Sequence, residues 1–145
     1  MKKLFAILVV LGIGMGVATL GRSQEPIDVS SLPFSAAVQA GPTLYLSGQI
    51  PIRPDGTVVT ESVGAETRQT MDNIGRTLKE YGYTFDDVVS VTVYLKDMKD
   101  YAQMNTAYRE YFKNGFPARA CVGGLQIAFD SRLEISCIAY KEPGE

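Results

Sequence analysis

The chain contains no histidine. This absence excludes the Ser-His-Asp and Cys-His arrangements of nucleophilic enzymes, and every metal site that needs an imidazole ligand. The two cysteines, Cys121 and Cys137, also lack the Cys-x-x-Cys spacing of zinc sites and thioredoxin-like redox pairs. Any acid-base chemistry must therefore use carboxylate, tyrosine or cysteine side chains, or a water held by backbone groups.

Runs of basic residues are scarce as well. The chain has 14 basic and 16 acidic residues, a net charge of −2, and no basic run beyond its first three residues. It therefore lacks the electrostatic footprint of a nucleic-acid-binding protein, and no nucleic-acid partner is expected. A hydrophobic fraction of 46% against 21% charged residues is typical of a compact globular protein, and 145 residues suffice for one domain.

The first 23 residues differ in kind from the rest. Lys2 and Lys3 precede an apolar run over 4–17, and small residues follow up to Ser23. A charged start, a short apolar middle and a small-residue end predict a signal peptide over 1–23, cleaved after Ala18, Gly21 or Ser23. The domain over 24–145 would then be exported, periplasmic or secreted, without stable membrane insertion. The alternative is a membrane anchor formed by an uncleaved N-terminal segment.

Hydrophobic periodicity predicts strands, then a helix, a strand, a second helix and two final strands. The expected strands cover 36–39, 43–47, 89–95, 116–122 and 133–138, and the expected helices cover 64–82 and 97–115. Asp97 or Asp100 would cap the second helix. This order predicts an α+β fold in which two helices cover one sheet face. The other face would be buried in a closed homo-oligomer.

The last two predicted strands each carry one charged residue of interest, Arg119 and Glu134, and we interpret these strands as neighbours. An arginine is always charged, and its planar fork matches a carboxylate. A glutamate at the edge of an apolar sheet can act as a general acid or base, or hold a water. Together they favour a clamp for a small acid beside a proton-transfer group. The alternative is a surface cross-strand ion pair that contributes little.

Several motifs match one known family in order. The most specific is Pro117–Val122 together with Leu133–Ile135, in which the glutamate follows the arginine by fifteen residues. The supporting matches are Leu46–Pro51, Glu66–Ile74 and Met104–Tyr108. From about Pro33 to Tyr140 the sequence resembles the Rid or YjgF family, the reactive intermediate deaminases, and specifically their RidA-like branch.

This resemblance implies a chorismate-mutase-like (YjgF-like) mixed sheet with two helices on one face. It also implies a homotrimer with sites between subunits. The implied activity is hydrolysis of small 2-imino acids or enamines, such as 2-iminopropanoate and 2-iminobutanoate, to 2-keto acids and ammonia. Neither metal nor organic cofactor takes part in it. Imines of small acids are already electrophilic, so orientation, a water and proton transfer meet the chemical demand.

The resemblance also implies roles for single residues. Arg119 would bind the substrate carboxylate in a two-pronged pair. Glu134 would hold or activate the attacking water and help to protonate the leaving nitrogen. Cys121 would line the pocket through its backbone and side chain, although a small buried apolar role suits it equally well.

Four further positions complete the implied site. Ser47 and Gly48 would shape the pocket, and Asn105 would support it. Without the resemblance, Ser47 and Gly48 could equally form a bulge at the end of a strand. Asn105 could equally cap a helix or hydrogen-bond to the helix backbone alone. Phe34 stands where many RidA-like members carry a tyrosine, so one hydrogen bond to substrate or water would be missing.

The two cysteines are predicted to stay unpaired. An exported protein would favour a disulfide between them. If Arg119 and Glu134 share a face, strand alternation places Cys121 and Cys137 on opposite faces, which forbids a bridge. A competing function remains open: a trimeric binding module that holds small carboxylates without turnover, or a holdase-like protein. Ribonuclease action is disfavoured by the charge and the missing histidine.

Overall fold

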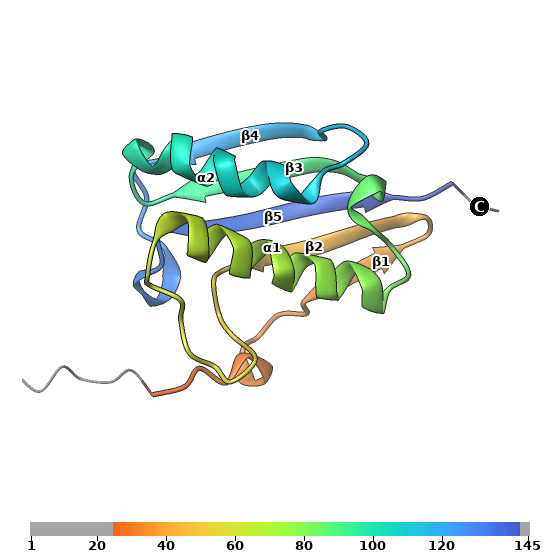
Figure 1. Cartoon of the computed structure of the whole chain (residues 1–145). Helices are drawn as coiled ribbons and strands as arrows, with labels where there is room; N and C mark the ends of the chain where they lie inside the picture. The colour runs from red at the N-terminus through yellow and green to blue at the C-terminus, as the bar shows by residue number, and fades with distance from the viewer. Residues whose placement is uncertain (1–24, 143–145) are drawn as a thin grey trace, which may run out of the picture.

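The computed structural model describes residues 25–142 (Figure 1). Its main elements are β1 (Ala37–Ala40), β2 (Thr43–Gln49), α1 (Val63–Glu80), β3 (Val88–Leu95), α2 (Tyr101–Tyr108), β4 (Ala118–Gly123) and β5 (Leu133–Tyr140). This is the predicted order of strands and helices. No helix within the described residues is both long and apolar enough to cross a bilayer. The predicted signal peptide over 1–23 lies outside these residues.

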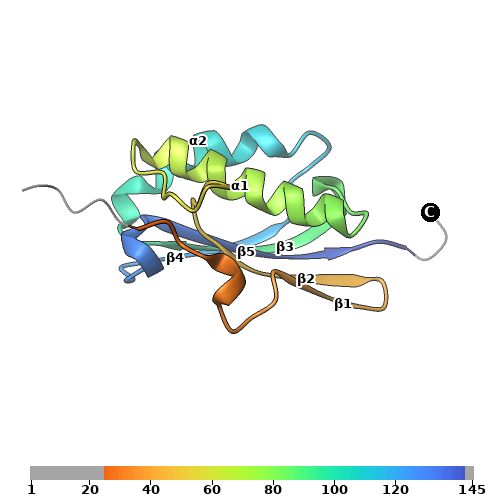
Figure 2. The ribbon, with the colours of Figure 1, turned by 90° about the horizontal axis from the view of Figure 1, so that it is seen from below.

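The five strands form one mixed sheet in the order β1-β2-β5-β3-β4. Only β3 and β4 pair in parallel, and the other neighbours are antiparallel. Both helices cover the same face (Figure 2). The predicted α+β fold, with a mixed sheet and two helices on one face, is thus confirmed. The other face leaves apolar side chains exposed, among them Val38, Tyr45 and Val122, so the expected homo-oligomer has an uncovered face to bury.

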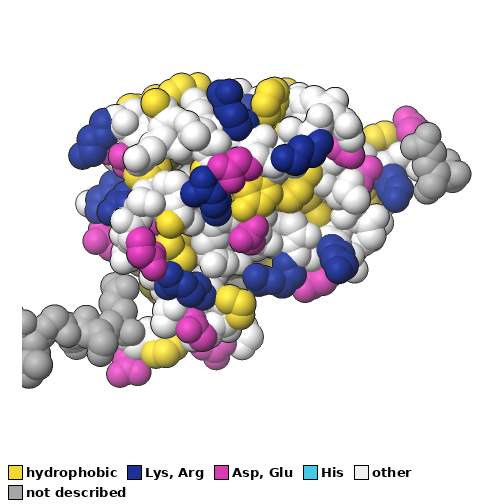
Figure 3. All heavy atoms as spheres, in the orientation of Figure 1, with side chains coloured by type: hydrophobic (Ala, Val, Ile, Leu, Met, Phe, Trp, Pro, Cys, Tyr) yellow, Lys and Arg dark blue, Asp and Glu magenta, His cyan; other side chains and the backbone are white. Residues whose placement is uncertain are grey.

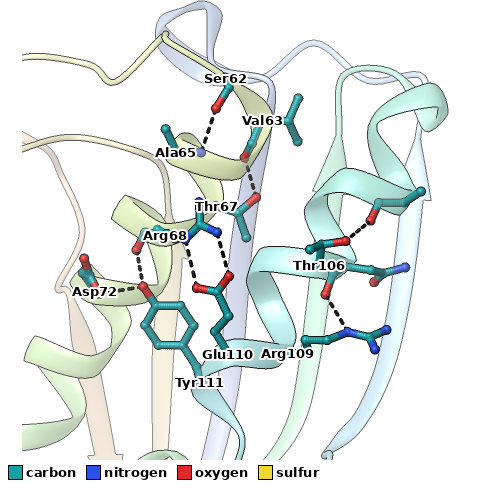
Figure 4. Close-up of polar contacts among 12 residues, drawn as sticks. Ser62, Val63, Ala65, Thr67, Arg68, Asp72, Thr106, Arg109, Glu110 and Tyr111 are labelled. Carbon is teal, nitrogen blue, oxygen red and sulfur yellow. Dashed lines mark hydrogen bonds and ion pairs between the residues drawn. The ribbon is translucent and has the colours of Figure 1, made fainter.

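Helix α1 follows from the spacing of its apolar residues. Met71, Ile74 and Leu78 recur every three or four positions, and all three are buried against the sheet. Burying side chains of this size contributes roughly 1.5–3 kcal/mol each. The Ser62 hydroxyl accepts the Ala65 N–H at 3.1 Å and caps the first turn (Figure 4).

Helix α2 is shorter than predicted. It ends at Tyr108 and passes into a 3-10 turn over Arg109–Tyr111, whereas the sequence predicted a helix reaching 114–115. Of the two predicted caps, Asp100 is the N-cap residue of α2, although its side chain makes no capping bond, and Asp97 caps a preceding 3-10 turn by accepting the Lys99 N–H at 2.9 Å. The backbone turns extended at Phe112, which packs its ring against Phe85 and Tyr108. This aromatic cluster accounts for the early end of the helix.

A polar network joins α1 to the 3-10 turn that follows α2 (Figure 4). Arg68 donates from Nε and Nη2 to the two carboxylate oxygens of Glu110, at 2.9 and 2.6 Å. The Tyr111 hydroxyl donates to Asp72 Oδ1 at 2.7 Å. Across the helical face, positive and negative side chains are interspersed without a patch of one sign (Figure 3). The ion pair between Arg68 and Glu110 is exposed, so it adds little to stability.

Candidate functional site

Arg119 and Glu134 lie on opposite faces of the sheet. In the strand register Arg119 pairs with Val91, and Val91 pairs with Cys137, so all three point to the face that the helices cover. Glu134 pairs with Tyr94, which points to the open face. The prediction that these two residues sit on neighbouring strands was wrong. Strand β3 pairs with both β4 and β5 and separates them.

The separation within one chain is large. Arg119 is level with Cys137, which is three residues beyond Glu134 along β5. Three residues of rise and two strand spacings place the Arg119 and Glu134 Cα atoms about 14 Å apart. In a 2-imino acid, the carboxylate and the imine carbon are bonded neighbours. One chain therefore does not bring this pair onto one small substrate, and each residue belongs to a separate pocket.

The pocket around Arg119, here called the Arg119 half-site, lies where Arg119 of β4 meets residues of α2. The guanidinium carbon lies 4.7 Å from the ring centroid of Tyr108 and 5.7 Å from that of Tyr101, and Nη2 donates to the Tyr101 hydroxyl at 3.3 Å. Burial raises the pKa of Tyr108 to about 12, so its hydroxyl stays neutral. The pocket has a volume of about 350 Å³. Its lining consists of Asn105, Tyr108, Arg109, Phe116, Pro117 and Arg119.

The Glu134 half-site lies at the end of the sheet where the N-terminal segment, the β2–α1 loop and the β4–β5 connection meet (Figures 1 and 2). Its pocket has a volume of about 620 Å³, and Phe34, Gly48 and Glu134 are among its lining residues. A Cβ on Gly48 would lie 1.7 Å from Glu134 Oε1. The carboxylate therefore occupies the space that a glycine leaves free, which is the close approach that Gly48 suggested.

The environment of Glu134 suits proton transfer. Burial raises the pKa of its carboxyl group, because desolvation disfavours the charged form. No hydrogen bond from another described residue opposes this effect. A carboxylate whose pKa is raised accepts a proton more readily than an ordinary one, and it can return that proton to a basic nitrogen.

Ser47 supports the pocket without lining it. Its hydroxyl donates to the Ser35 carbonyl at 2.6 Å and its N–H donates to the Ala36 carbonyl at 3.0 Å. The register of β2 shifts between Leu46 and Gln49, so the predicted bulge at Ser47 and Gly48 is present. These bonds fix the segment that carries Phe34, whose exposed ring reaches the pocket.

Cys121 lines neither pocket. Its side chain packs against the hydrophobic core, and burial raises the pKa of its thiol in spite of nearby Arg119. Cys137 is buried deeper, with a thiol pKa of about 12. Both cysteines are free, as predicted, but the reason given for it was wrong. They share the helix-covered face, and β3 keeps them about 10 Å apart, beyond the roughly 7 Å limit for a bridge.

Sequence reasoning missed two contributors. One is Tyr101, whose ring and hydroxyl both engage Arg119. The other is Phe129, which has a left-handed backbone (φ 55°) and lines the Glu134 pocket. The stretch from Phe129 to Ser131 carried only a bend signal, and nothing in it indicated a left-handed phenylalanine. The tyrosine stood out only as an apolar residue of a helix.

The described domain matches one family over nearly its whole length. Residues 25–141 match the family model described as endoribonuclease L-PSP. The chain belongs to the Rid/YjgF (L-PSP) family. A RutC family protein of Pyrococcus horikoshii is 47% identical over 111 residues, which are 76% of this chain and 88% of that protein. The family assignment agrees with the motifs around Arg119 and Glu134.

A relative with a named activity and a solved structure also match. The Homo sapiens protein named 2-iminobutanoate/2-iminopropanoate deaminase is 40% identical over 112 residues, 77% of this chain and 82% of its own. The structure of the Escherichia coli YjgF gene product superposes with a TM-score of 0.74 at 33% identity, over 81% of this chain and 93% of that one. The YjgF-like fold of this family member is thus established.

Proposed function

We propose that this protein hydrolyses 2-imino acids and enamines to 2-keto acids and ammonia. Two observations support the proposal: a relative with this named activity is 40% identical, and the chain carries an arginine and a glutamate suited to that chemistry. The glutamate has a raised carboxyl pKa and lies in a pocket against Gly48. No nucleophile beyond water is needed for an electrophilic imine.

The active site would form between two subunits of a homotrimer. The observation that carries this step is that Arg119 and Glu134 face opposite sides of one sheet, in pockets that share no residue. A neighbouring subunit can bring its Arg119 half-site against the Glu134 half-site, whereas one chain cannot close on itself. The open sheet face, with Val38, Tyr45 and Val122 exposed, supplies apolar surface for such an assembly.

The reaction then follows from the residues. The Arg119 fork holds the substrate carboxylate through two N–H donors. The Glu134 carboxylate accepts a proton from water as the water oxygen bonds to the imine carbon. The same group returns the proton to the nitrogen, which gives a carbinolamine. It then takes the proton of the new hydroxyl group and passes it to the nitrogen as the carbon–nitrogen bond breaks, so that the carbonyl of the 2-keto acid forms and ammonia leaves. The raised pKa of Glu134 matches both steps.

The test is imine hydrolysis by the purified protein. An amino-acid oxidase generates 2-iminopropanoate or 2-iminobutanoate in situ, and semicarbazide traps the imine that remains. We expect turnover by the wild type and its loss in Arg119→Ala. Arg68→Ala is the matched control, because Arg68 pairs with Glu110 between the helices and lies outside both pockets. Equal loss in both variants would contradict a specific role for Arg119.

A second candidate is a trimeric binding module for small carboxylates. The observation that favours it is Phe34, whose ring carries no hydroxyl to hold a substrate or a water at the pocket where many family members carry a tyrosine. This candidate expects 2-ketobutanoate to raise the melting temperature while no imine is consumed. Activity that appears only in Phe34→Tyr would also support it.

We further propose export of the domain, on the basis of residues 1–23 alone. Cell fractionation and the intact mass of the mature protein test this proposal. A mature chain that begins near Ser23 in the exported fraction is expected. A full-length chain held in the membrane fraction would favour the uncleaved anchor.

A further inference from the structure

The pocket beside Glu134 is much larger than the substrates named above require. In the single subunit its volume is about 620 Å³, whereas 2-iminopropanoate carries only a methyl group as its side chain. We propose that the preferred substrates are 2-imino acids with bulky apolar side chains, branched or aromatic. This proposal rests on the proposed function and deepens it, since it names the substituent that the same site accepts.

Apolar side chains form most of the pocket wall. They come from the N-terminal segment, the β2–α1 loop and the β4–β5 connection, and include Ile27, Val29, Leu32, Phe34, Ile52 and Phe129. Two of them, Val29 and Phe34, are more than half exposed, at 54% and 57%. A ligand that covers these side chains removes apolar surface from water, which favours an apolar substituent.

The polar groups of the wall are largely engaged within the protein. Asn73 donates to the Ile50 and Ile52 carbonyls at 3.1 and 2.9 Å, and the guanidinium of Arg53 pairs with Glu61. The second cation of the wall, Arg76, donates to Asn73 Oδ1 at 3.2 Å. An apolar substituent needs no new polar partner, whereas a charged one would have to compete with these contacts. Glu134 remains for the reacting end of the substrate.

Phe129 supplies the strongest local sign of a specific function. Its backbone is left-handed, and so is that of Asp130, at φ 55° and 58°. Bulky residues rarely adopt this conformation. Two contacts lie beside this segment: Asp130 pairs with Lys96 at 2.5 Å, and the Arg132 N–H donates to buried Glu66 at 2.9 Å. Strain of this kind concentrates at ligand sites, and here it brings a phenyl ring to the wall of the Glu134 pocket.

The substrate would then lie in one orientation. Its imine carbon sits beside Glu134, its carboxylate points to the incoming Arg119, and its side chain extends between Phe129 and Val29. A methyl side chain would leave most of this space to water. In a hydrophobic pocket each added methylene commonly changes kcat/KM by about tenfold or more. A branched or aromatic substituent should therefore be favoured by at least about tenfold over methyl.

The test compares kcat/KM for three imines generated in situ from leucine, alanine and glutamate, each corrected for its uncatalysed loss. We expect the imine from leucine to exceed that from alanine by about tenfold or more. Phe129→Ala and Val29→Ala should each reduce this ratio severalfold. Leu125→Ala is the matched control, because Leu125 lies on the same β4–β5 connection, is similarly exposed and lines neither pocket.

The possible results distinguish a failure of the side-chain preference from a failure of the proposed deaminase function. Equal or faster hydrolysis of the imine from alanine would overturn the preference and leave the deaminase function standing. Preference for the imine from glutamate would also overturn it, and would indicate that Arg53 or Arg76 binds a second carboxylate. Hydrolysis of none of the three would contradict the proposed function itself. An unchanged ratio in both pocket variants would remove Phe129 and Val29 from the binding of the side chain.

Discussion

Replacing Gly48 with alanine should abolish the proposed imine hydrolysis while leaving the fold intact. An added Cβ would lie 1.7 Å from Glu134 Oε1 and 2.6 Å from Glu134 Cδ, whereas ordinary contact begins at 3.4 Å. The carboxylate must therefore retreat by about 1.7 Å, the difference between 3.4 and 1.7 Å. A misplacement of about 1 Å can reduce the rate by about 100-fold. We expect kcat to fall by at least this factor.

Stability should change little, because the atoms that must move end a flexible side chain. The free energy of unfolding is expected to change by less than about 1 kcal/mol, since no buried group of the core moves. Gly64→Ala is the matched control. Its added Cβ meets nothing closer than Arg68 Nη1, at 3.4 Å.

The assay pairs imine hydrolysis with thermal unfolding for both glycine variants. Full activity in Gly48→Ala would refute the reasoning, because the reaction would then not depend on where the Glu134 carboxylate lies. A large loss of stability in Gly48→Ala alone would show that the contact is structural rather than functional. A crystal structure of the variant should show the carboxylate displaced from position 48.

Three further predictions concern single residues. Arg132→Ala should destabilise the fold by about 1–3 kcal/mol near pH 7. Burial raises the folded-state pKa of Glu66, and the positive charge of Arg132 opposes that rise. The loss of stability should therefore shrink as the pH falls, because protonated Glu66 needs no cation. Chemical denaturation at pH 7 and at lower pH measures the change. Tyr101→Phe should raise KM about threefold, because it removes a hydrogen bond to Arg119, with kcat nearly unchanged. Tyr101→Leu should raise KM about tenfold, because it also removes the ring beside the guanidinium. KM values equal to that of the wild type in steady-state assays would contradict this positioning role. Burial raises the folded-state pKa of Glu134, so its charged form opposes folding, and it does so only above the unfolded-state pKa. Glu134→Gln should therefore raise the melting temperature at pH 7 and not at pH ~4. A lower melting temperature at pH 7 would show that the carboxylate stabilises the fold.

Local patterns were sufficient to predict the elements. The spacing of Met71, Ile74 and Leu78 predicts α1, and alternation along 89–95 predicts β3, because both record which residues must be buried. The early end of α2 escaped prediction. The end of the helix depends on the packing of the Phe112 ring against Phe85, and these two residues are far apart in the sequence.

Several residues that line the two pockets were named from the sequence, but their geometry was not predicted. Arg119 and Glu134 were singled out from their motifs, yet their faces are set by the register that each strand makes with β3. A shift of one residue in either pairing would reverse a face, and nothing local specifies it. The left-handed backbone of Phe129 was likewise beyond prediction, because no local residue pattern indicates it and the neighbouring Asp130 and Arg132 contact residues far away in the sequence.

Subunit complementation tests the central claim most directly. Arg119→Ala and Glu134→Gln should each be inactive as pure proteins. Equal co-expression of the two variants, verified by native mass spectrometry, should recover about a quarter of wild-type activity. About three quarters of the trimers are then mixed, and in each of these one site of the three combines an intact arginine with an intact glutamate from the neighbouring subunit. Mixed trimers without any recovered activity would contradict a site shared between subunits.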